Sequence, residues 1–595
     1  MDWVKNSLAL GNRRTFNQVD SKHKRIMAVI LSCSVLVFSY SKLPSLGRLF
    51  HFARGSFGRL VILGLGAPLL VLYETFRSLY SLLSFSTIHI SDVCVDESDF
   101  ASEQELSETL DRIGGCGART TGSKIHNELV QWLENELHSI PGLSIRNSDD
   151  EILRWQTKPT ESLGEAGSLS LSRPEGNVVV PVAGAVPFSL PTTGLSGPLL
   201  YLPPDIPITD VDVVGKIILR EFPAHPVPYP MVFLPAHSRT RDLDADLLKN
   251  YDRPGLADEP LSRDLIAAGK AGAAGMIIMF DIERSQIESY FEPHQGVHYQ
   301  LPAVFVGADE AAMLRAEASR STFASLTIRA EVSTQLSRNI FATLPGQTKE
   351  RVIYQTHTDG NTFIQENGAV AVLALARYFA KQPLSARKRT IEFALTSGHL
   401  HISHEGSALH ADNLDSHYDA DGNLVLVIPM EHLGSREIDA FPRGTGKPGR
   451  ELRFTGRGEI MFWCVGPSPP VVKAVQRAVA RRKLDRVLIT RGTSMPDTSR
   501  VPTFTSFGGI GTYYHNKLLP TTSLISGPWS LWAPGFGRDA VDISRMRSQI
   551  LAMGDVYLAI QDVSRDEIAG GYRDYRQKRA NGAETAPSLI PSEHP

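Results

Sequence analysis

The sequence predicts an α/β protein built on a mixed sheet that is flanked by helices, and three observations support this class. An apolar strand signal, Arg351-Val-Ile-Tyr354, runs into Gln-Thr-His-Thr-Asp-Gly360, and an apolar helix opens near Asn367. From about residue 337 to 564, strand and helix patterns alternate along the chain. Residues 160 to 335 carry short β-rich segments and Pro-rich loops instead, which predicts a separate β-rich module.

The first 85 residues differ in composition from the rest. A basic head leads into an uncharged run, Ile26 to Tyr40, and a second apolar run covers Leu60 to Tyr73. Three arrangements fit this pattern: a signal peptide followed by a buried helix, one signal anchor, or a hairpin of two membrane helices. We expect membrane anchoring by residues 26–41 and 60–73, since no cleavage site stands out after Tyr40. A single span would place the remaining chain outside the cytoplasm, which we favour, whereas a hairpin would return it.

Residues 92 to 155 predict a helical segment, with Leu129, Trp132, Leu133 and Leu137 at helical spacing. Within the β-rich segment, a helix of small residues starting at Leu265 runs directly into an apolar strand that ends at Phe280. Such a run predicts a closely packed helix–strand unit. The tail, residues 565–595, is polar and rich in Gly, Arg and Pro, so we expect it to be disordered.

Length and composition limit the class of protein. A chain of 595 residues predicts two or three domains. The net charge of -3 gives no electrostatic reason to expect a nucleic acid as partner. Four scattered cysteines are too few for a disulfide framework or a thiolate metal site.

A His-x-Asp pair lies where the central strand ends. His357 and Asp359 close the strand signal, and Glu366 follows at the start of the next helix. The carboxyl ends of strands in open α/β sheets are where ligands and metals collect. A neutral imidazole held by a carboxylate suits a divalent cation such as zinc.

Several motifs occur together in a fixed order and carry a resemblance. They are Gly117-Ala-Arg-Thr-Thr-Gly-Ser123, His357-Thr-Asp359, Thr390-Ile-Glu-Phe-Ala-Leu-Thr-Ser-Gly398, Gly406-Ser407, Met430-Glu-His-Leu-Gly434 and Leu519-Pro-Thr-Thr-Ser-Leu-Ile-Ser-Gly-Pro528. Across residues 100 to 565 the chain resembles the co-catalytic zinc peptidase superfamily. That superfamily holds zinc aminopeptidases, glutamate carboxypeptidase, glutaminyl cyclases and the inactive relatives transferrin receptor and nicastrin.

The resemblance implies a zinc-exopeptidase-like α/β/α domain made from residues 92–155 and 337–564 together. It implies that residues 160–335 are an inserted protease-associated-like domain, and it suggests a homodimer. His357 matches the histidine that binds the first metal, and Asp359 matches the residue that orients it. Glu366 falls where a metal-bridging carboxylate is expected, and Glu431 where another carboxylate ligand of the first metal is expected. Both are Glu where the family usually has Asp, which moves the oxygen by about 1.5 Å.

The second half of the family's site is incomplete in this sequence. Depending on the motif used for alignment, Leu400 or His399 occupies the position of the general base, and His401 the position of a second-metal Glu. The final histidine of the family corresponds to Ala533. We therefore expect His357, Glu366 and Glu431 to converge on one zinc ion, with His399 or His401 on the rim in an acid–base role.

Three functions remain open from the sequence. The first is a single-zinc hydrolase of a peptide or amide substrate, in which a histidine replaces the missing carboxylate base. The second is a catalytically inactive, membrane-anchored binding protein of the transferrin receptor or nicastrin type. The third is an acyl or amide enzyme of small-molecule metabolism. Bound zinc that depends on His357 separates the first from the second.

Overall fold

A mixed five-stranded sheet positions the motifs singled out above. The computed structural model describes residues 88–223, 226–293, 298–400, 405–493, 497, 499–503 and 506–586. The strand order is β1-β13-β15-β14-β16, in which β14 pairs in parallel with β15 and β16 while β13 and β1 run antiparallel. The bounds are β1 (Ser144–Thr157), β13 (Ala330–Leu344), β14 (Thr348–His357), β15 (Arg389–Thr396) and β16 (Leu424–Pro429).

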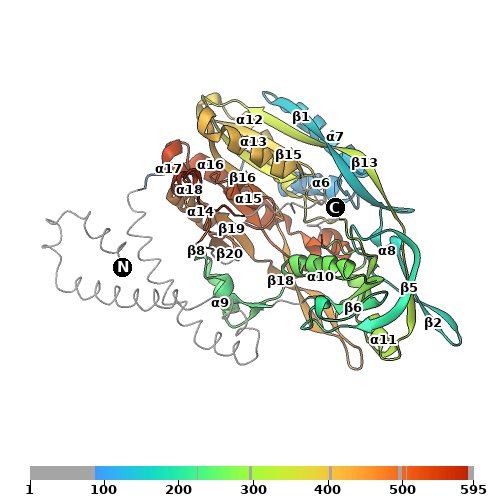
Figure 1. The fold of residues 1–595 in the computed structure, drawn as a ribbon. Helices are drawn as coiled ribbons and strands as arrows, with labels where there is room; N and C mark the ends of the chain where they lie inside the picture. The colour runs from blue at the N-terminus through green and yellow to red at the C-terminus, as the bar shows by residue number, and fades with distance from the viewer. Residues whose placement is uncertain are drawn as a thin grey trace, which may run out of the picture. The chain divides into compact units, whose positions relative to one another are not determined.

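Helices cover both faces of this sheet because its central strands are apolar on both sides. On one face, Ile353 and Ala394 belong to a core cluster with residues of α13 (Glu405–Asp421). On the other, Tyr354 stacks on Phe379 of α12 (Gly368–Lys381) and donates its hydroxyl to the carbonyl of Met553 in α16 (Ile543–Ala559). The predicted α/β/α layering over residues 337–564 is therefore present (Figure 1).

A second sheet, ordered β21-β19-β20-β8, continues from the first. Bridges from Val427 to Thr521 and from Met430 to Leu524 join β16 to β21. The edge strand β8 comes from the chain between the two predicted parts of the α/β domain. The bounds are β8 (Ala236–Arg239), β19 (Met461–Val465), β20 (Val487–Thr490), β21 (Thr522–Ile525), α14 (Pro469–Arg481) and α15 (Gly511–Asn516).

The β-rich segment forms a sheet of its own, ordered β3-β2-β12-β5-β6-β10-β11-β4. The predicted helix–strand unit is confirmed as α10 (Asp258–Lys270) followed by β10 (Gly275–Met279). That these residues are protease-associated-like stays a prediction. The other bounds are β2 (Gly167–Arg173), β3 (Gly176–Val180), β4 (Gly184–Ala185), β5 (Thr192–Tyr201), β6 (Ile217–Glu221), β11 (Ala303–Val306), β12 (Phe323–Ile328), α8 (Leu163–Ala166) and α11 (Ala308–Ala318).

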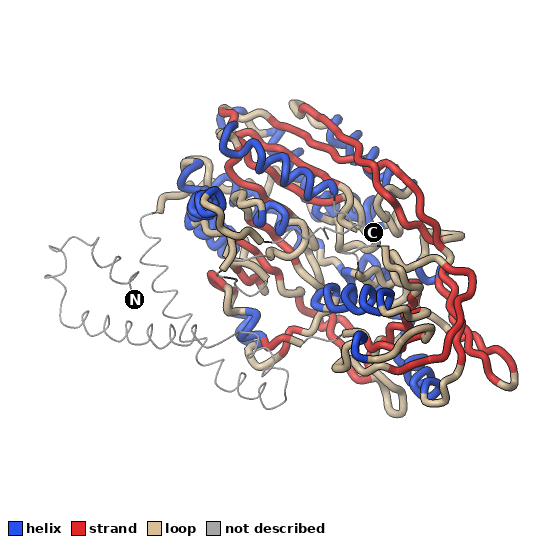
Figure 2. Tube along the Cα trace, in the orientation of Figure 1, coloured by secondary structure: helices blue, strands red, loops and turns tan. Residues whose placement is uncertain are grey.

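A two-stranded ribbon crosses the domain boundaries expected near residues 155 and 335. β1 and β13 pair without a break from Ser144–Thr343 to Thr157–Ala330. The two long strands run together along one side of the structure, from the helix-covered sheet to the β-rich sheet (Figure 2). The first segment of the predicted α/β domain therefore packs on the second through a continuous ladder, as expected. Its helices are α6 (Glu103–Gly114) and α7 (Lys124–His138).

The prediction of a disordered tail from residue 565 is wrong for its first part. α17 (Arg565–Ala569) begins with a capping box between Ser564 and Glu567, and α18 (Gly571–Ala580) buries Tyr572 completely. The hydroxyl of Tyr572 lies 2.7 Å from Nδ1 of His515. A buried aromatic anchor offsets the polar composition that suggested disorder.

One short α-helix and four short strands remain among the described α-helices and strands. They are α9 (Tyr229–Val232), β7 (Val227–Pro228), β9 (Asn250–Tyr251), β17 (Arg436–Pro442) and β18 (Arg450–Gly458). The segments expected to anchor the chain in a membrane, residues 26–41 and 60–73, lie outside the described residues. Within the described part of the chain, every helix is too short or too polar to span a bilayer.

Candidate metal centre

His357 is the last residue of β14 and is completely buried. Its Nδ1 lies 2.8 Å from the backbone carbonyl oxygen of Asp359 and 3.6 Å from the Asp359 carboxylate. An N–H at Nδ1 would donate to that carbonyl, which leaves the lone pair of Nε2 pointing away. Burial alone lowers the pKa of His357, but the carboxylates of Asp359 and Glu431 outweigh it and raise the pKa above its ordinary value.

Glu431 follows the neighbouring strand β16 and faces His357. Its Oε1 lies 3.5 Å from Nε2 of His357, and neither atom has a hydrogen-bond partner although both are buried. Its Oε2 accepts the backbone N–H of Ile510 at 3.0 Å, which fixes the direction of the carboxylate. Burial raises the pKa of Glu431 to about 7.

His399 comes from the third strand end, just after β15. The rings of His357 and His399 are 4.3 Å apart between centroids, and Nε2 of His399 lies 3.9 Å from Oε1 of Glu431. One ligand atom from each of the three residues lies within 4.8 Å of the other two. Because β15, β14 and β16 are parallel neighbours, their carboxyl ends bring the three side chains to one point.

Asp359 contacts both His357 and the chain that carries His399. Its Oδ2 accepts hydrogen bonds from the Thr121 hydroxyl and from the backbone N–H of Leu400, each at 2.6 Å. Burial alone would raise the pKa of this carboxyl, but its bonds to His357 and Thr121 keep it well below the ordinary value. Asp359 therefore lies beside the His357 ring, in the position expected for the residue that orients it.

Glu366 lies outside the three-residue cluster, contrary to the expected convergence of His357, Glu366 and Glu431. It is buried before α12, and its Oε1 pairs with the guanidinium of Arg119. The structure thus brings His399, expected on the rim, into the place expected for Glu366. The loop with His401 lies outside the described residues, so the acid–base role of His401 stays a prediction.

Three further residues shape the centre and were missed by the sequence reasoning. Arg119 and His126 come from the Gly117–Ser123 motif and helix α7, far from His357 in sequence. His126 lies 2.9 Å from the Thr358 hydroxyl, and burial lowers its pKa to about 4. Gly509 packs against Glu431 so closely that a Cβ atom would lie 2.0 Å from Oε2. The motif Gly117–Ser123 contains Arg119, but the sequence alone did not show that this motif would contact the metal centre.

The donor set fits a zinc ion. Two imidazole nitrogens and a carboxylate oxygen are zinc ligands, and three protein ligands with an open fourth position are typical of a catalytic zinc. Ligand atoms about 2.1 Å from a tetrahedral zinc lie about 3.4 Å apart. The 3.5 Å between Nε2 of His357 and Oε1 of Glu431 matches that spacing without a direct hydrogen bond.

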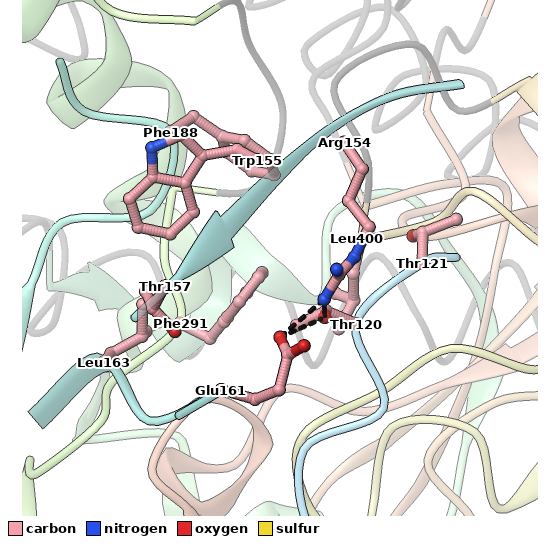
Figure 3. A pocket seen from close by; sticks show the side chains of 10 residues that line it. All are labelled: Thr120, Thr121, Arg154, Trp155, Thr157, Glu161, Leu163, Phe188, Phe291 and Leu400. Carbon is pink, nitrogen blue, oxygen red and sulfur yellow. Dashed lines mark hydrogen bonds and ion pairs between the residues drawn. The ribbon is translucent and has the colours of Figure 1, made fainter. Parts of the chain in front are cut away.

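A small cavity adjoins the centre through Thr121 and Leu400, both bonded to Asp359 (Figure 3). The picture shows Arg154 and Glu161 turned toward each other along one side, with Nη2 and Oε2 2.5 Å apart. The volume of about 10 Å³ holds about one water molecule. The remaining lining residues are Thr120, Trp155, Thr157, Leu163, Phe188 and Phe291.

Comparison with known proteins places the fold. No family model matches the sequence, and no curated protein matches it. The zinc aminopeptidase BSAP from Bacillus subtilis is 15% identical, with a TM-score of 0.52 over 76% of this chain and 94% of that one. A peptidase M28 precursor from Shewanella amazonensis SB2B is 17% identical, with a TM-score of 0.53 over 84% of this chain and 97% of that one. The predicted resemblance is confirmed at the level of the fold, which the chain shares with these two solved structures.

Proposed function

We propose that this protein is a hydrolase of amide or peptide bonds with a single-zinc site formed by His357, His399 and Glu431. The observation that supports the proposal is the pair of buried, unpartnered atoms that face each other, Nε2 of His357 and Oε1 of Glu431. Leaving both groups without a partner is costly, and a shared cation removes that cost. The fold, which is also that of a zinc aminopeptidase, supports the same chemistry.

The described residues have separate tasks in such a site. A zinc ion, when bound, would lower the pKa of a water molecule and polarise a substrate carbonyl. Asp359 holds the His357 ring so that Nε2 faces the centre, and Ile510 fixes the Glu431 carboxylate. These contacts preorganise the donors before a substrate arrives.

The site lacks the carboxylate that serves as the general base in the family. The position of the family's carboxylate base is occupied by His399 or Leu400, and His399 belongs to the metal cluster. Without that carboxylate, the rate loses a contribution of about 10²-fold or more. We therefore expect weak hydrolysis of simple aminoacyl substrates, with His401 as the candidate proton carrier.

Metal analysis of the purified full chain tests the proposal. We expect close to one zinc per chain, lost in His357→Ala and in Glu431→Gln. The exposed His417 offers a matched control, and His417→Ala should retain the zinc. A wild-type protein without zinc would refute the proposal. Zinc without any hydrolysis of a peptide library would favour the inactive binding protein instead.

Membrane anchoring through residues 26–41 and 60–73 is part of the proposal. A single span among them would place the hydrolase domain outside the cytoplasm, the arrangement we favour, whereas two spans would return it. The basic flank and the uncharged apolar runs support it. Fractionation of the full chain and of a variant that lacks residues 1–85 tests it. The full chain should require detergent and the shortened chain should not, so recovery of both in the soluble fraction would contradict anchoring.

A further inference from the structure

A buried ion pair lies beside the metal centre but supplies none of its three metal-ligating side chains. Arg119 and Glu366 are 0% and 1% exposed, and Nη2 of Arg119 pairs with Oε1 of Glu366. The same Nη2 donates to the carbonyl of Thr362 at 2.7 Å, and Nη1 donates to the carbonyl of Gly117. Nη1 also donates to the carbonyl of Gly114 at 3.5 Å, so the guanidinium is held at four points and has a fixed place.

The backbone of Arg119 is bound to the same stretch of chain. Its N–H donates to the carbonyl of Gly360 at 2.7 Å, and the N–H of Gly360 donates back at 3.1 Å. Gly360 leaves room for the acid, since a Cβ atom there would lie 1.6 Å from Oε2 of Glu366. Main chain and side chain of Arg119 therefore hold both ends of the segment from Gly360 to Glu366.

That segment begins directly after Asp359, which contacts the His357 ring and the N–H of Leu400. A shift of Gly360 would move Asp359 and, with it, two of the three residues of the centre. The positive charge of Arg119 also stabilises the Glu366 carboxylate, because a buried carboxylate needs a cation or a proton. Burial lowers the pKa of Arg119 to about 10, so the guanidinium stays charged at neutral pH.

We infer that Arg119 is the built-in cation of Glu366 and a positioning residue of the metal centre, which therefore takes one divalent ion. The fold family implies a second ion near a bridging carboxylate, and the residues here do not fit one. Glu366, the expected bridge, is neutralised by Arg119. Among the described residues, His357, His399 and Glu431 form the one group of three metal-ligating side chains. The one-ion statement rests on the proposed function, whereas the ion pair does not.

A mutant cycle with two measurements tests the inference. Arg119→Met keeps an unbranched side chain as long as the part of arginine up to Nε but leaves Glu366 buried without a cation, so Tm should fall by several degrees. Glu366→Gln combined with Arg119→Met removes both charges and should restore most of that loss. Arg119→Lys retains the charge, so its Tm should lie between those of the wild type and Arg119→Met.

Zinc affinity separates positioning from a purely structural role. Arg119→Met should bind zinc about 10-fold or more weakly, as for other residues that hold metal ligands in place. Glu366→Gln alone should retain one zinc. The matched control is Arg482→Met, which breaks a similarly buried pair with Asp555 (2.8 Å). It should lower Tm without changing zinc affinity.

Three results would overturn the inference: two zinc ions retained by the wild type after dialysis, loss of zinc in Glu366→Gln, or unchanged zinc affinity in Arg119→Met. Absence of zinc from the wild type would refute the proposed function instead. In that case the Tm cycle still decides whether Arg119 and Glu366 stabilise each other.

Discussion

The carboxylate of Asp359 accepts the backbone N–H of Leu400 at 2.6 Å while its own backbone carbonyl lies 2.8 Å from Nδ1 of His357. One residue thus fixes a ligand on β14 and the chain that carries His399 after β15. The two histidines are 42 positions apart in sequence, and their ring centroids lie 4.3 Å apart. Asp359 therefore sets the geometry of the centre without belonging to it.

Substitution of Asp359 by Asn should weaken zinc binding about 10- to 100-fold. The amide replaces one acceptor oxygen by a donor, which would then face Thr121 and Leu400 or the ring of His357. Competition with a chromogenic chelator measures the effect. Thr121→Val removes one of the two hydrogen-bond donors to Oδ2 of Asp359 and should weaken zinc binding less than Asp359→Asn does. Wild-type affinity in Asp359→Asn would show that the link is unnecessary.

Gly509→Ala should reduce zinc affinity by moving Glu431. A Cβ atom at residue 509 would lie 2.0 Å from Oε2, and φ of +46° is already unfavourable for other residues. Gly508→Ala is the matched control, since φ there is +69° and the new Cβ would meet Ile525 instead. Both variants should lose stability in urea unfolding, but Gly509→Ala should lose far more zinc affinity. Equal losses of affinity would point to general strain.

Stability should fall in mild acid because of His126. Burial depresses its pKa from 6.5 to about 4, so the unfolded chain takes up the proton first as the pH falls. The loss of unfolding free energy begins below about pH 6.5 and is complete by about pH 4. Its size is on the order of 3 kcal/mol.

Urea unfolding at neutral pH and at about pH 4.5 measures this term. In His126→Gln the difference in unfolding free energy between the two pH values should shrink. His138, exposed on the same helix α7, offers the control, and His138→Gln should retain the wild-type difference. An undiminished difference in His126→Gln would assign the acid sensitivity to other groups.

Removal of zinc should lower the thermal stability of the wild type. An ion bound only by the folded state stabilises it by about 2.7 kcal/mol at a free concentration of about 100 times Kd. Dialysis against a chelator should lower Tm, and added zinc should restore it. His357→Ala should show neither change. A chelator effect of equal size in His357→Ala would place the ion elsewhere.

The ends of the central strands could be predicted because local pattern determines them. A run of apolar residues closed by a polar one marks where a buried parallel strand leaves the sheet. That rule found His357 and Asp359, and the ordered motifs added Glu431. A run of small residues that leads directly into an apolar strand likewise predicted the helix that precedes β10. In each case the signal lies within about ten residues of the element it predicts.

The partner of Glu366 and the role of His399 were decided by the tertiary structure alone. Arg119 lies 247 positions before Glu366, and no local pattern says which cation a buried carboxylate will meet. His399 reaches the centre because β15 lies beside β14 in the sheet, a neighbourhood set by strand pairing. Sequence by itself determined which side chains stand at strand ends. Packing and charge neutralisation, which act between distant segments, decided which of them meet.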